Sequence, residues 1–263
     1  MNILSKIVSK RKEETNLQKK IRGLDEIKSS ESFHRQTYSL SKKIKESEIS
    51  IIAEHKRKSP SKKEINFQTP SHKIIKGYEK NGASGISVLT EKNFFSGSEN
   101  DLILARKLTD LPILRKDFIV DEYQVFESKY LGADAILLIA TCLTDKEIIK
   151  LSELAKELDL DVLVEIHSKD ELKKVCIDSV DIIGVNNRNL KDFSVNVENS
   201  IEIGKEIPES FVKISESGLY KFEELKRLID FGYDGFLIGE LFMREIDPGY
   251  KLGNLINQIK GES

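Results

Sequence analysis

One pattern repeats along most of this chain: a short, almost continuously apolar run rich in β-branched residues, then a polar stretch with helical periodicity. Apolar runs of this length are typical of parallel strands that are covered on both faces. The stretches between them, such as 144–158 and 220–232, place apolar residues at helical spacing, and Gly232 is a typical helix stop. The runs occupy residues 49–55, 85–90, 112–118, 134–140, 161–166, 181–186, 211–215 and 235–239.

Eight such strand–helix units in 263 residues predict a single closed (β/α)8 barrel, the TIM-barrel fold of the α/β class. An open doubly wound sheet is the alternative, and it favours a glycine-rich turn after the first strand. Residues 56–61 follow that strand instead, with the sequence Lys-Arg-Lys-Ser-Pro-Ser. The closed barrel is therefore favoured, and we place it at residues 49–263 as one domain.

Residues 1–48 precede the barrel and contain two amphipathic segments, 5–21 and 32–48, that predict helices. This N-terminal helical extension is too charged to form a core and too long to be a simple tail. We expect it to pack on one mouth of the barrel, as part of a lid. A solvated pair of helices on the outside of the barrel is an equally good interpretation.

Charge and cysteine content limit the class of protein. The chain has 42 basic and 44 acidic residues, so a formal net charge of −2 gives no general attraction for nucleic acid. Its two cysteines, Cys142 and Cys176, cannot form a disulfide framework and favour a reducing compartment. No apolar run reaches the roughly 18 residues of a membrane-spanning helix, and the N-terminus lacks a signal-peptide core. We predict a cytoplasmic monomer with no membrane or nucleic-acid partner.

Polar side chains follow the predicted strands at the end where barrel enzymes place their functional groups. Glu54 and Lys56 are two residues apart, so both point to the same side of an extended chain. Burying one charge costs several kcal/mol unless it is paired, so a purely structural ion network is the alternative for any single residue. Five strand ends with such groups at one mouth indicate a functional site instead: Glu54 and Lys56, Lys116, Glu165, Asn186 and Arg188, and Glu216.

Two glycine-containing loops predict a phosphate site. Ser217 and Gly218 follow the seventh strand, and Gly239 and Glu240 follow the eighth, where a short helix begins. Barrels commonly bind phosphate with the loops after these two strands, because backbone N–H groups can approach the anion closely there. Ser59, which lies among lysine and arginine residues, can donate a further hydrogen bond. The expected partner is a phosphorylated small molecule.

The segments at these strand ends resemble the indole-3-glycerol-phosphate synthase family over nearly the whole chain. They are IIAEHKRKSPSK, LTEKNFFSGS, PILRKDFIVDEYQ, LVEIH, GVNNRNL, ISESGL and LIGELFMR, in strand order. The resemblance implies the substrate 1-(2-carboxyphenylamino)-1-deoxyribulose 5-phosphate. The family converts it to indole-3-glycerol phosphate, carbon dioxide and water in tryptophan biosynthesis. It also implies a lyase that needs no metal, nucleotide or redox cofactor.

The same resemblance implies residue roles. Lys116 resembles the general acid that protonates the sugar ketone, and Glu165 resembles the general base for the dehydration. Lys56 would bridge the substrate's carboxylate and phosphate ends, with Arg188 on the carboxylate side. It implies that Glu54 and Asn186 orient the substrate and that Glu216 holds a lysine in place. The positions implied to line the aromatic pocket are Phe95, Phe118, Leu137 and Leu190. Those implied to bind phosphate are Ser59, Ser217, Gly218, Gly239 and Glu240, the last through its backbone N–H alone.

An acid and a base of different character are needed in one dry site. We expect a lysine whose pKa is lowered by neighbouring cations and a glutamate whose pKa is raised by burial.

Three residues depart from the family pattern: Lys63 stands for a glycine, Asn189 for an aspartate and Leu241 for a small hydroxyl residue. None of them is the acid or the base, so we expect altered affinity rather than lost activity.

The other reactive side chains have simpler explanations. The four histidines lack metal-ligand spacing, and we expect His55 and His167 to lie beside the site in opposite register to Glu54 and Glu165. Cys142 is interpreted as a small packed residue, because the sequence places no base beside it. The basic segment 56–63 is short and lacks the interleaved aromatic residues of a nucleic-acid patch.

Two rival functions fit part of the pattern. Another sugar-phosphate barrel enzyme could use Lys56 or Lys116 as a Schiff-base lysine. A degenerate barrel could bind a ligand without catalysis, but a decayed site is expected to have lost some of these polar groups.

Overall fold

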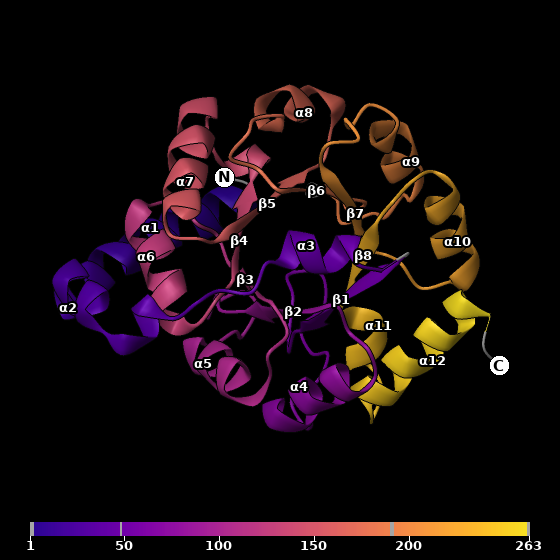
Figure 1. Ribbon diagram of the computed structural model, residues 1–263, viewed down its shortest axis with the longest axis horizontal. Coiled ribbons are helices and arrows are strands. Elements are labelled where there is room, and N and C mark those ends of the chain that lie inside the picture. The colour runs from indigo at the N-terminus through magenta and orange to yellow at the C-terminus, as the bar shows by residue number, and fades with distance from the viewer. Residues whose placement is uncertain (1–2, 48, 190–191, 262–263) are drawn as a thin grey trace.

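The computed structural model describes residues 3–47, 49–189 and 192–261. Within these ranges eight parallel strands close into a barrel in chain order, and helices surround it (Figure 1). The predicted TIM barrel is therefore confirmed, with each strand within two residues of its expected bounds. The strands are β1 (Ser50–His55), β2 (Gly85–Leu89), β3 (Ile113–Lys116), β4 (Ala135–Ile139), β5 (Asp161–Ile166), β6 (Ile182–Asn186), β7 (Val212–Glu216) and β8 (Gly235–Ile238).

Local sequence signals set the helix ends. In α7 the Thr144 hydroxyl accepts from the Glu147 N–H while the Glu147 carboxylate accepts from the Thr144 N–H, a capping box. No helix in the described ranges is long and apolar enough to cross a membrane. The helices are α1 (Ile3–Ile21), α2 (Leu24–Ser29), α3 (Leu40–Lys45), α4 (Ser71–Lys80), α5 (Glu99–Leu108), α6 (Glu122–Leu131), α7 (Asp145–Glu157), α8 (Lys169–Val175), α9 (Glu198–Gly204), α10 (Phe222–Asp230), α11 (Glu240–Met243) and α12 (Pro248–Lys260), with 3-10 turns η1 (Glu31–His34) and η2 (Ala140–Cys142).

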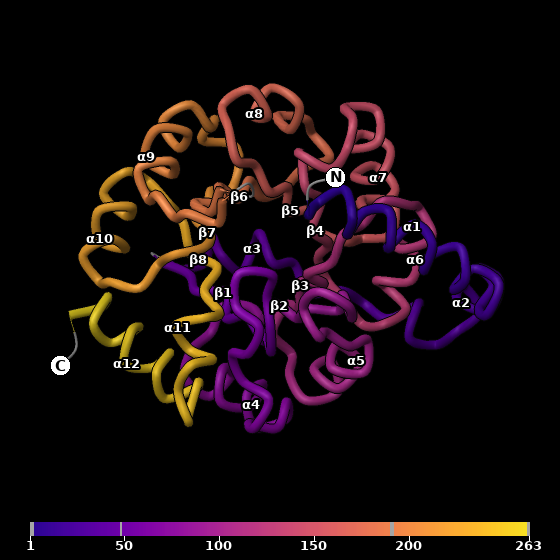
Figure 2. Tube along the Cα trace, turned by 180° about the vertical axis from the view of Figure 1, so that it is seen from behind, coloured from indigo at the N-terminus to yellow at the C-terminus, as the bar shows by residue number. Residues whose placement is uncertain are grey.

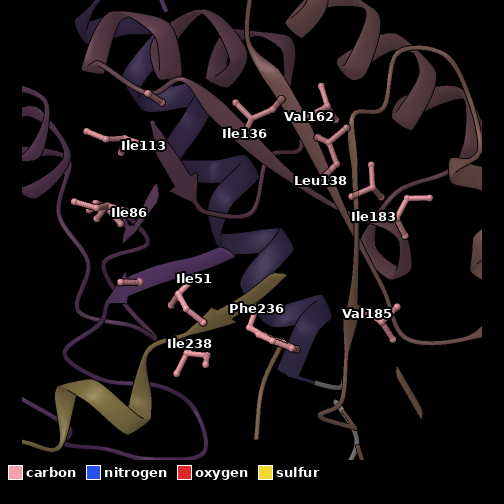
Figure 3. Packing of buried hydrophobic residues seen from close by; sticks show 14 of the residues in the cluster. Ile51, Ile86, Ile113, Ile136, Leu138, Val162, Ile183, Val185, Phe236 and Ile238 are labelled. Atoms are coloured by element: carbon pink, nitrogen blue, oxygen red, sulfur yellow. The ribbon is translucent and has the colours of Figure 1, made fainter. Parts of the chain in front are cut away.

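Alternation along each strand divides the core into two layers. Ile51 belongs to the layer between the strands and the outer helices, whereas the next residue, Ile52, belongs to the cluster inside the barrel. Figure 3 shows the outer layer, in which Ile86, Ile136 and Phe236 from three different strands lie among their neighbours. Most strands are thus buried on both faces, which explains the almost continuous apolar runs in the sequence; the exception on β7 is Lys213, which is half-buried.

The N-terminal extension divides between three places. Helix α1 contacts α6 and η2, and Figure 2 shows it crossing the barrel edge beside α6. Helix α2 and η1 pack on the outer face of α6. Helix α3 lies at the opposite end of the barrel, where Leu40 and Ile44 join the interior cluster and the Ser50 hydroxyl donates to the Ile44 carbonyl at 3.1 Å.

The prediction of one helix over 32–48 was wrong. Residues 35–39 are extended between η1 and α3. The Arg35 guanidinium and the Tyr38 N–H both donate to Asp134, at 2.7 and 3.0 Å, just before β4. These long-range contacts keep the segment extended, and the local sequence periodicity does not predict them.

Candidate active site

One pocket opens at the carboxyl ends of the strands, and every predicted site residue that the structure describes lines it. Leu190 lies outside the described residues. The pocket is lined by Glu54, Lys56, Ser59, Phe95, Lys116, Phe118, Leu137, Glu165, Asn186, Arg188, Glu216, Ser217, Gly218, Gly239 and Glu240, together with residues from α1 and from the loops after β1, β6, β7 and β8.

The first strand contributes an ion pair. Lys56 Nζ lies 2.5 Å from Glu54 Oε1, as expected for side chains two residues apart on an extended chain. Gly239 packs against this carboxylate, since a Cβ there would lie 2.7 Å from Glu54 Oε1. The loop that follows is held by Arg57, whose guanidinium binds Asp101 of α5 at 2.5 and 2.9 Å. The basic segment is therefore part of the barrel's own packing.

Lys116, the last residue of β3, lies at the centre of the pocket between two carboxylates. Its Nζ donates to Glu216 Oε2 of β7 and, at 3.3 Å, to Glu165 Oε2 of β5. The two carboxylates belong to strands flanking β6, where Asn186 pairs with Glu216 and Gly184 pairs with Glu165. A Cβ on Gly184 would overlap Glu216 Oε1, so only glycine leaves this carboxylate its position.

These three buried groups set each other's protonation. Burial opposes the charged form of Lys116, but the carboxylates of Glu216, Glu165 and Glu54 outweigh it and raise the lysine's pKa. Burial also opposes ionisation of Glu165, but the Lys116 ammonium and the His167 ring lower its pKa below the usual value. For Glu216, burial and the neighbouring carboxylates raise the pKa to about 7, against the opposing effect of Lys116.

The expectation about the lysine was therefore wrong, because carboxylates raise its pKa and cations do not lower it. A glutamate whose pKa is raised by burial and by its carboxylate neighbours is present, as expected, but it is Glu216 and not the expected base, Glu165. The reason is geometric: Lys116 forms ion pairs with the acidic side chains of β5 and β7. Lys116 begins protonated and Glu165 begins ionised, which are the starting forms of a proton donor and a proton acceptor.

The loop after β7 has a backbone suited to an anion. Ser217 and Gly218 are both in the left-handed region, with φ of 68° and 71°. This conformation is strained for serine, and strain of this kind gathers at ligand sites. After β8 the Glu240 carboxylate does more than expected: it pairs with Arg244 and lies 3.6 Å from Lys62 and 3.8 Å from Arg188.

An apolar wall faces these charges. The rings of Phe95 and Phe118 lie 6.2 Å apart between centroids, and Leu137 of β4 is buried beside them. Phe95 is fixed by Glu91, whose buried carboxylate accepts from the N–H groups of Phe94 and Phe95 at 2.7 and 3.0 Å. The pocket is therefore charged on one side and aromatic on the other.

Comparison with known proteins identifies the family. Residues 4–255 match the family model described as Indole-3-glycerol phosphate synthase. This chain belongs to that family. An indole-3-glycerol phosphate synthase from Bacteroides thetaiotaomicron is 42% identical over 259 residues, covering 98% of this chain and 99% of the relative. One from Campylobacter jejuni is 45% identical over 258 residues, covering 97% of this chain and 100% of the relative. The resemblance drawn from the strand-end motifs is confirmed.

Solved structures with low identity share the fold alone. Thiamine phosphate pyrophosphorylase from Pyrococcus furiosus has a TM-score of 0.63 at 16% identity, covering 85% of this chain and 99% of that one. The 3-hexulose-6-phosphate synthase from Salmonella typhimurium has a TM-score of 0.63 at 13% identity, covering 80% of this chain and 99% of that one. These likenesses agree with the barrel of the synthase family.

Sequence reasoning expected the N-terminal extension at a mouth of the barrel, but it did not identify the residues of α1 that reach the pocket. Ile3, Leu4 and Ile7 line the pocket, and one turn further along the helix Arg11 Nη2 binds Asp117 Oδ2 at 2.9 Å. Both side chains are almost fully buried. The apolar spacing of the first turns was the available signal, but the partner of Arg11 is 106 positions away in the sequence.

The expectation about histidine register was right for one residue and wrong for another. His55 points outward toward Asp101, as expected, and burial lowers its pKa to about 4. His167 instead lies on the same side of the chain as Glu165, with Nε2 3.5 Å from Glu165 Oε1. Residues 165 and 167 are two apart and share a side, like Glu54 and Lys56. Cys142 packs against the core, and burial followed by two nearby carboxylates raises its pKa to about 12, so it is a protonated thiol.

Proposed function

We propose that this chain catalyses the reaction of its family. It would close the indole ring of 1-(2-carboxyphenylamino)-1-deoxyribulose 5-phosphate to give indole-3-glycerol phosphate, carbon dioxide and water. The observation that carries the proposal is the placement of Lys116, a buried ammonium bound by two carboxylates from β5 and β7 at the mouth of the barrel. A phosphate-type loop after β7 and an aromatic wall complete the pocket.

Ring closure needs a proton on the ketone oxygen. In the proposal, Lys116 gives that proton while the carboxylate-bearing ring carbon attacks the carbonyl carbon. Carbon dioxide then leaves, and the electron pair of the broken bond restores the aromatic ring. Glu216 holds the ammonium in place through its hydrogen bond. General acid catalysis of this kind contributes about 10²- to 10⁴-fold in rate.

Dehydration needs a base. Glu165, whose pKa is held low by Lys116, takes a carbon-bound proton. Lys116, once it has regained a proton, gives that proton to the hydroxyl, which leaves as water. Glu54 and Asn186 orient the amine and hydroxyl groups of the substrate. Asn186 also acts on the base, because its side chain helps to lower the pKa of Glu165.

The two anionic ends of the substrate are matched by cations and by backbone. Lys56 would bridge the carboxylate and phosphate ends, with Arg188 at the carboxylate. Ser59, Ser217, Gly218, Gly239 and Glu240 would hold the phosphate. An incoming phosphate would compete with the Glu240 carboxylate for Lys62, whose ammonium lies 3.6 Å from it. We also propose that the protein is cytoplasmic and acts as a monomer, with residues 1–48 as an extension of one barrel domain.

The test is the appearance of indole fluorescence after mixing purified protein with the carboxyphenylamino-deoxyribulose phosphate. The chain has no tryptophan, so product emission is separate from the protein's own signal. A time-dependent rise supports the proposal, and no rise from folded protein rejects it. Borohydride added with substrate separates the Schiff-base alternative, in which Lys56 or Lys116 forms a trappable adduct. We expect no covalent adduct.

A further inference from the structure

His167 occupies an unusual position behind the proposed base. Its Nε2 is buried, makes no hydrogen bond and lies 3.5 Å from Glu165 Oε1. The other oxygen of that carboxylate, Oε2, accepts from Lys116. Glu165 therefore lies between the lysine on the pocket side and the histidine on the far side. The histidine is absent from the pocket lining, and its contact with the pocket residues is through Glu165.

The far edge of the ring leads toward solvent. His167 Nδ1 lies 3.4 Å from the Thr141 hydroxyl, which donates to Glu171 Oε1 at 2.6 Å. Because the Thr141 proton points at Glu171, its oxygen can accept an Nδ1–H from a neutral His167. Thr141 is exposed, and the His167 side chain is 14% exposed. The result is a chain of polar atoms from the surface to Glu165.

Neighbouring contacts fix this arrangement. Glu171 Oε2 accepts from the His167 N–H at 2.7 Å, and Asn199 Nδ2 donates to the carbonyls of His167 and Asn186 at 3.3 and 3.1 Å. The carboxylates within 4 Å of the ring nitrogens are those of Glu165 and Glu171. With the ring proton on Nδ1, the Nε2 lone pair faces the Glu165 carboxylate and no hydrogen bond joins the two. A proton on either atom would create one.

The proton balance of the proposed reaction gives this chain of atoms a task. The substrate carboxylate leaves as neutral carbon dioxide, so one proton is consumed in each turnover. Two protons go to oxygen, one onto the ketone and one onto the departing hydroxyl, and one returns from carbon to Glu165. The second must come from water. Bound substrate would obstruct the direct entry of water into the pocket, whose lining includes Ile3, Leu4 and Ile7 of α1.

We propose that His167 carries protons between water and Glu165, so that the Glu165–Lys116 pair is recharged without opening the pocket. The inference rests on the proposed role of Glu165. A proton from water adds to His167, making the imidazolium, and Nε2–H passes it to Glu165 Oε1. The protonated Glu165 gives a proton to neutral Lys116, which restores the ammonium and the carboxylate. Every proton that reaches the lysine thus comes from water or from the substrate carbon.

The test is His167→Asn, with His72→Asn on the exposed face of α4 as the matched histidine control. We expect kcat of His167→Asn to fall by about tenfold or more, with KM within about twofold. The solvent deuterium isotope effect on kcat should rise, because proton uptake becomes limiting. Added imidazole should restore kcat of His167→Asn in a concentration-dependent way. The larger isotope effect and the response to imidazole should be absent from wild type and from His72→Asn.

Two results would overturn the inference: an unchanged kcat, or a lower kcat with no isotope effect and no response to imidazole, which would leave His167 a purely structural role. Matching thermal unfolding curves exclude a folding defect. Glu165→Gln separates the underlying proposal, because it should abolish the first turnover as well. If Glu165→Gln turns over normally, the role of Glu165 fails, and the relay fails with it for that distinct reason.

Discussion

The ion pair between Arg11 and Asp117 offers the sharpest test of how α1 completes the pocket. We predict that Arg11→Met, which keeps an apolar stem but removes the charge, loosens the helix that carries Ile3, Leu4 and Ile7. Asp117 is completely buried, but it is not left without partners. It still accepts from the Thr90 hydroxyl at 2.5 Å, from Arg115 at 3.3 Å and from the Phe118 N–H at 2.8 Å.

The remaining partners set the magnitude. Removing one partner of an isolated buried pair costs about 3–5 kcal/mol, whereas a single hydrogen bond between charged groups is worth about 1.5–3 kcal/mol. We expect Arg11→Met to cost the smaller amount, about 1.5–3 kcal/mol, because Asp117 keeps its other hydrogen-bond donors. If the lost stabilisation appears as local opening of α1, substrate can bind only after the helix closes. KM then rises by about tenfold for each 1.4 kcal/mol of free energy that closing the helix costs.

The assay combines steady-state kinetics with hydrogen exchange of the α1 amides and denaturant unfolding. Lys10→Met is the matched control: Lys10 is on the same helix, and its pair with Glu13 is exposed, with side chains 49% and 63% accessible. Such pairs contribute about 0–1 kcal/mol, so this variant should behave as wild type. The reasoning is refuted if Arg11→Met and Lys10→Met have the same KM, the same exchange in α1 and the same unfolding free energy.

Two further predictions follow from close packing and from burial. Gly184→Ala should push the Glu216 carboxylate away from Lys116, because the added Cβ would overlap Glu216 Oε1. We expect kcat to fall by about tenfold or more while the barrel stays folded. An unchanged kcat would mean that the position of this carboxylate is unimportant. The folded pKa of His55 is about 4, below the unfolded value of about 6.5, so the unfolded chain binds the extra proton and stability is lost as pH falls from 6.5 toward 4. This contribution amounts to about 3 kcal/mol at pH 4, and His55→Gln should remove it from a series of denaturant curves, whereas an identical pH profile in the variant would contradict the assignment.

The barrel could be predicted from the sequence because its evidence is local. Most strands are buried on both faces, so they leave apolar runs, and parallel strands bring their carboxyl ends to one mouth. That rule is sufficient to select Lys116, Glu165 and Glu216 from the sequence. Their convergence on a single ammonium follows from register, which pairs Asn186 with Glu216 and Ile139 with Glu165.

The parts that sequence reasoning missed depend on distance rather than on pattern. The pKa directions at Lys116 and Glu216 are set by which charges are nearest, and strand spacing does not reveal this. Arg11 finds its partner across 106 positions, and residues 35–39 are straightened by Asp134. His167 was placed in the wrong register although a two-residue spacing from Glu165 was readable.

The central claim is that Lys116 is the acid of an indole-forming reaction in this pocket. The most direct measurement compares product formation by wild type, Lys116→Ala and Lys213→Ala, a second strand lysine that alternates with the inward-facing Val212 and Ile214. The account predicts indole emission from wild type and from Lys213→Ala, and a rate lower by about 10²-fold or more for folded Lys116→Ala. Equal rates for the two lysine variants would contradict the account.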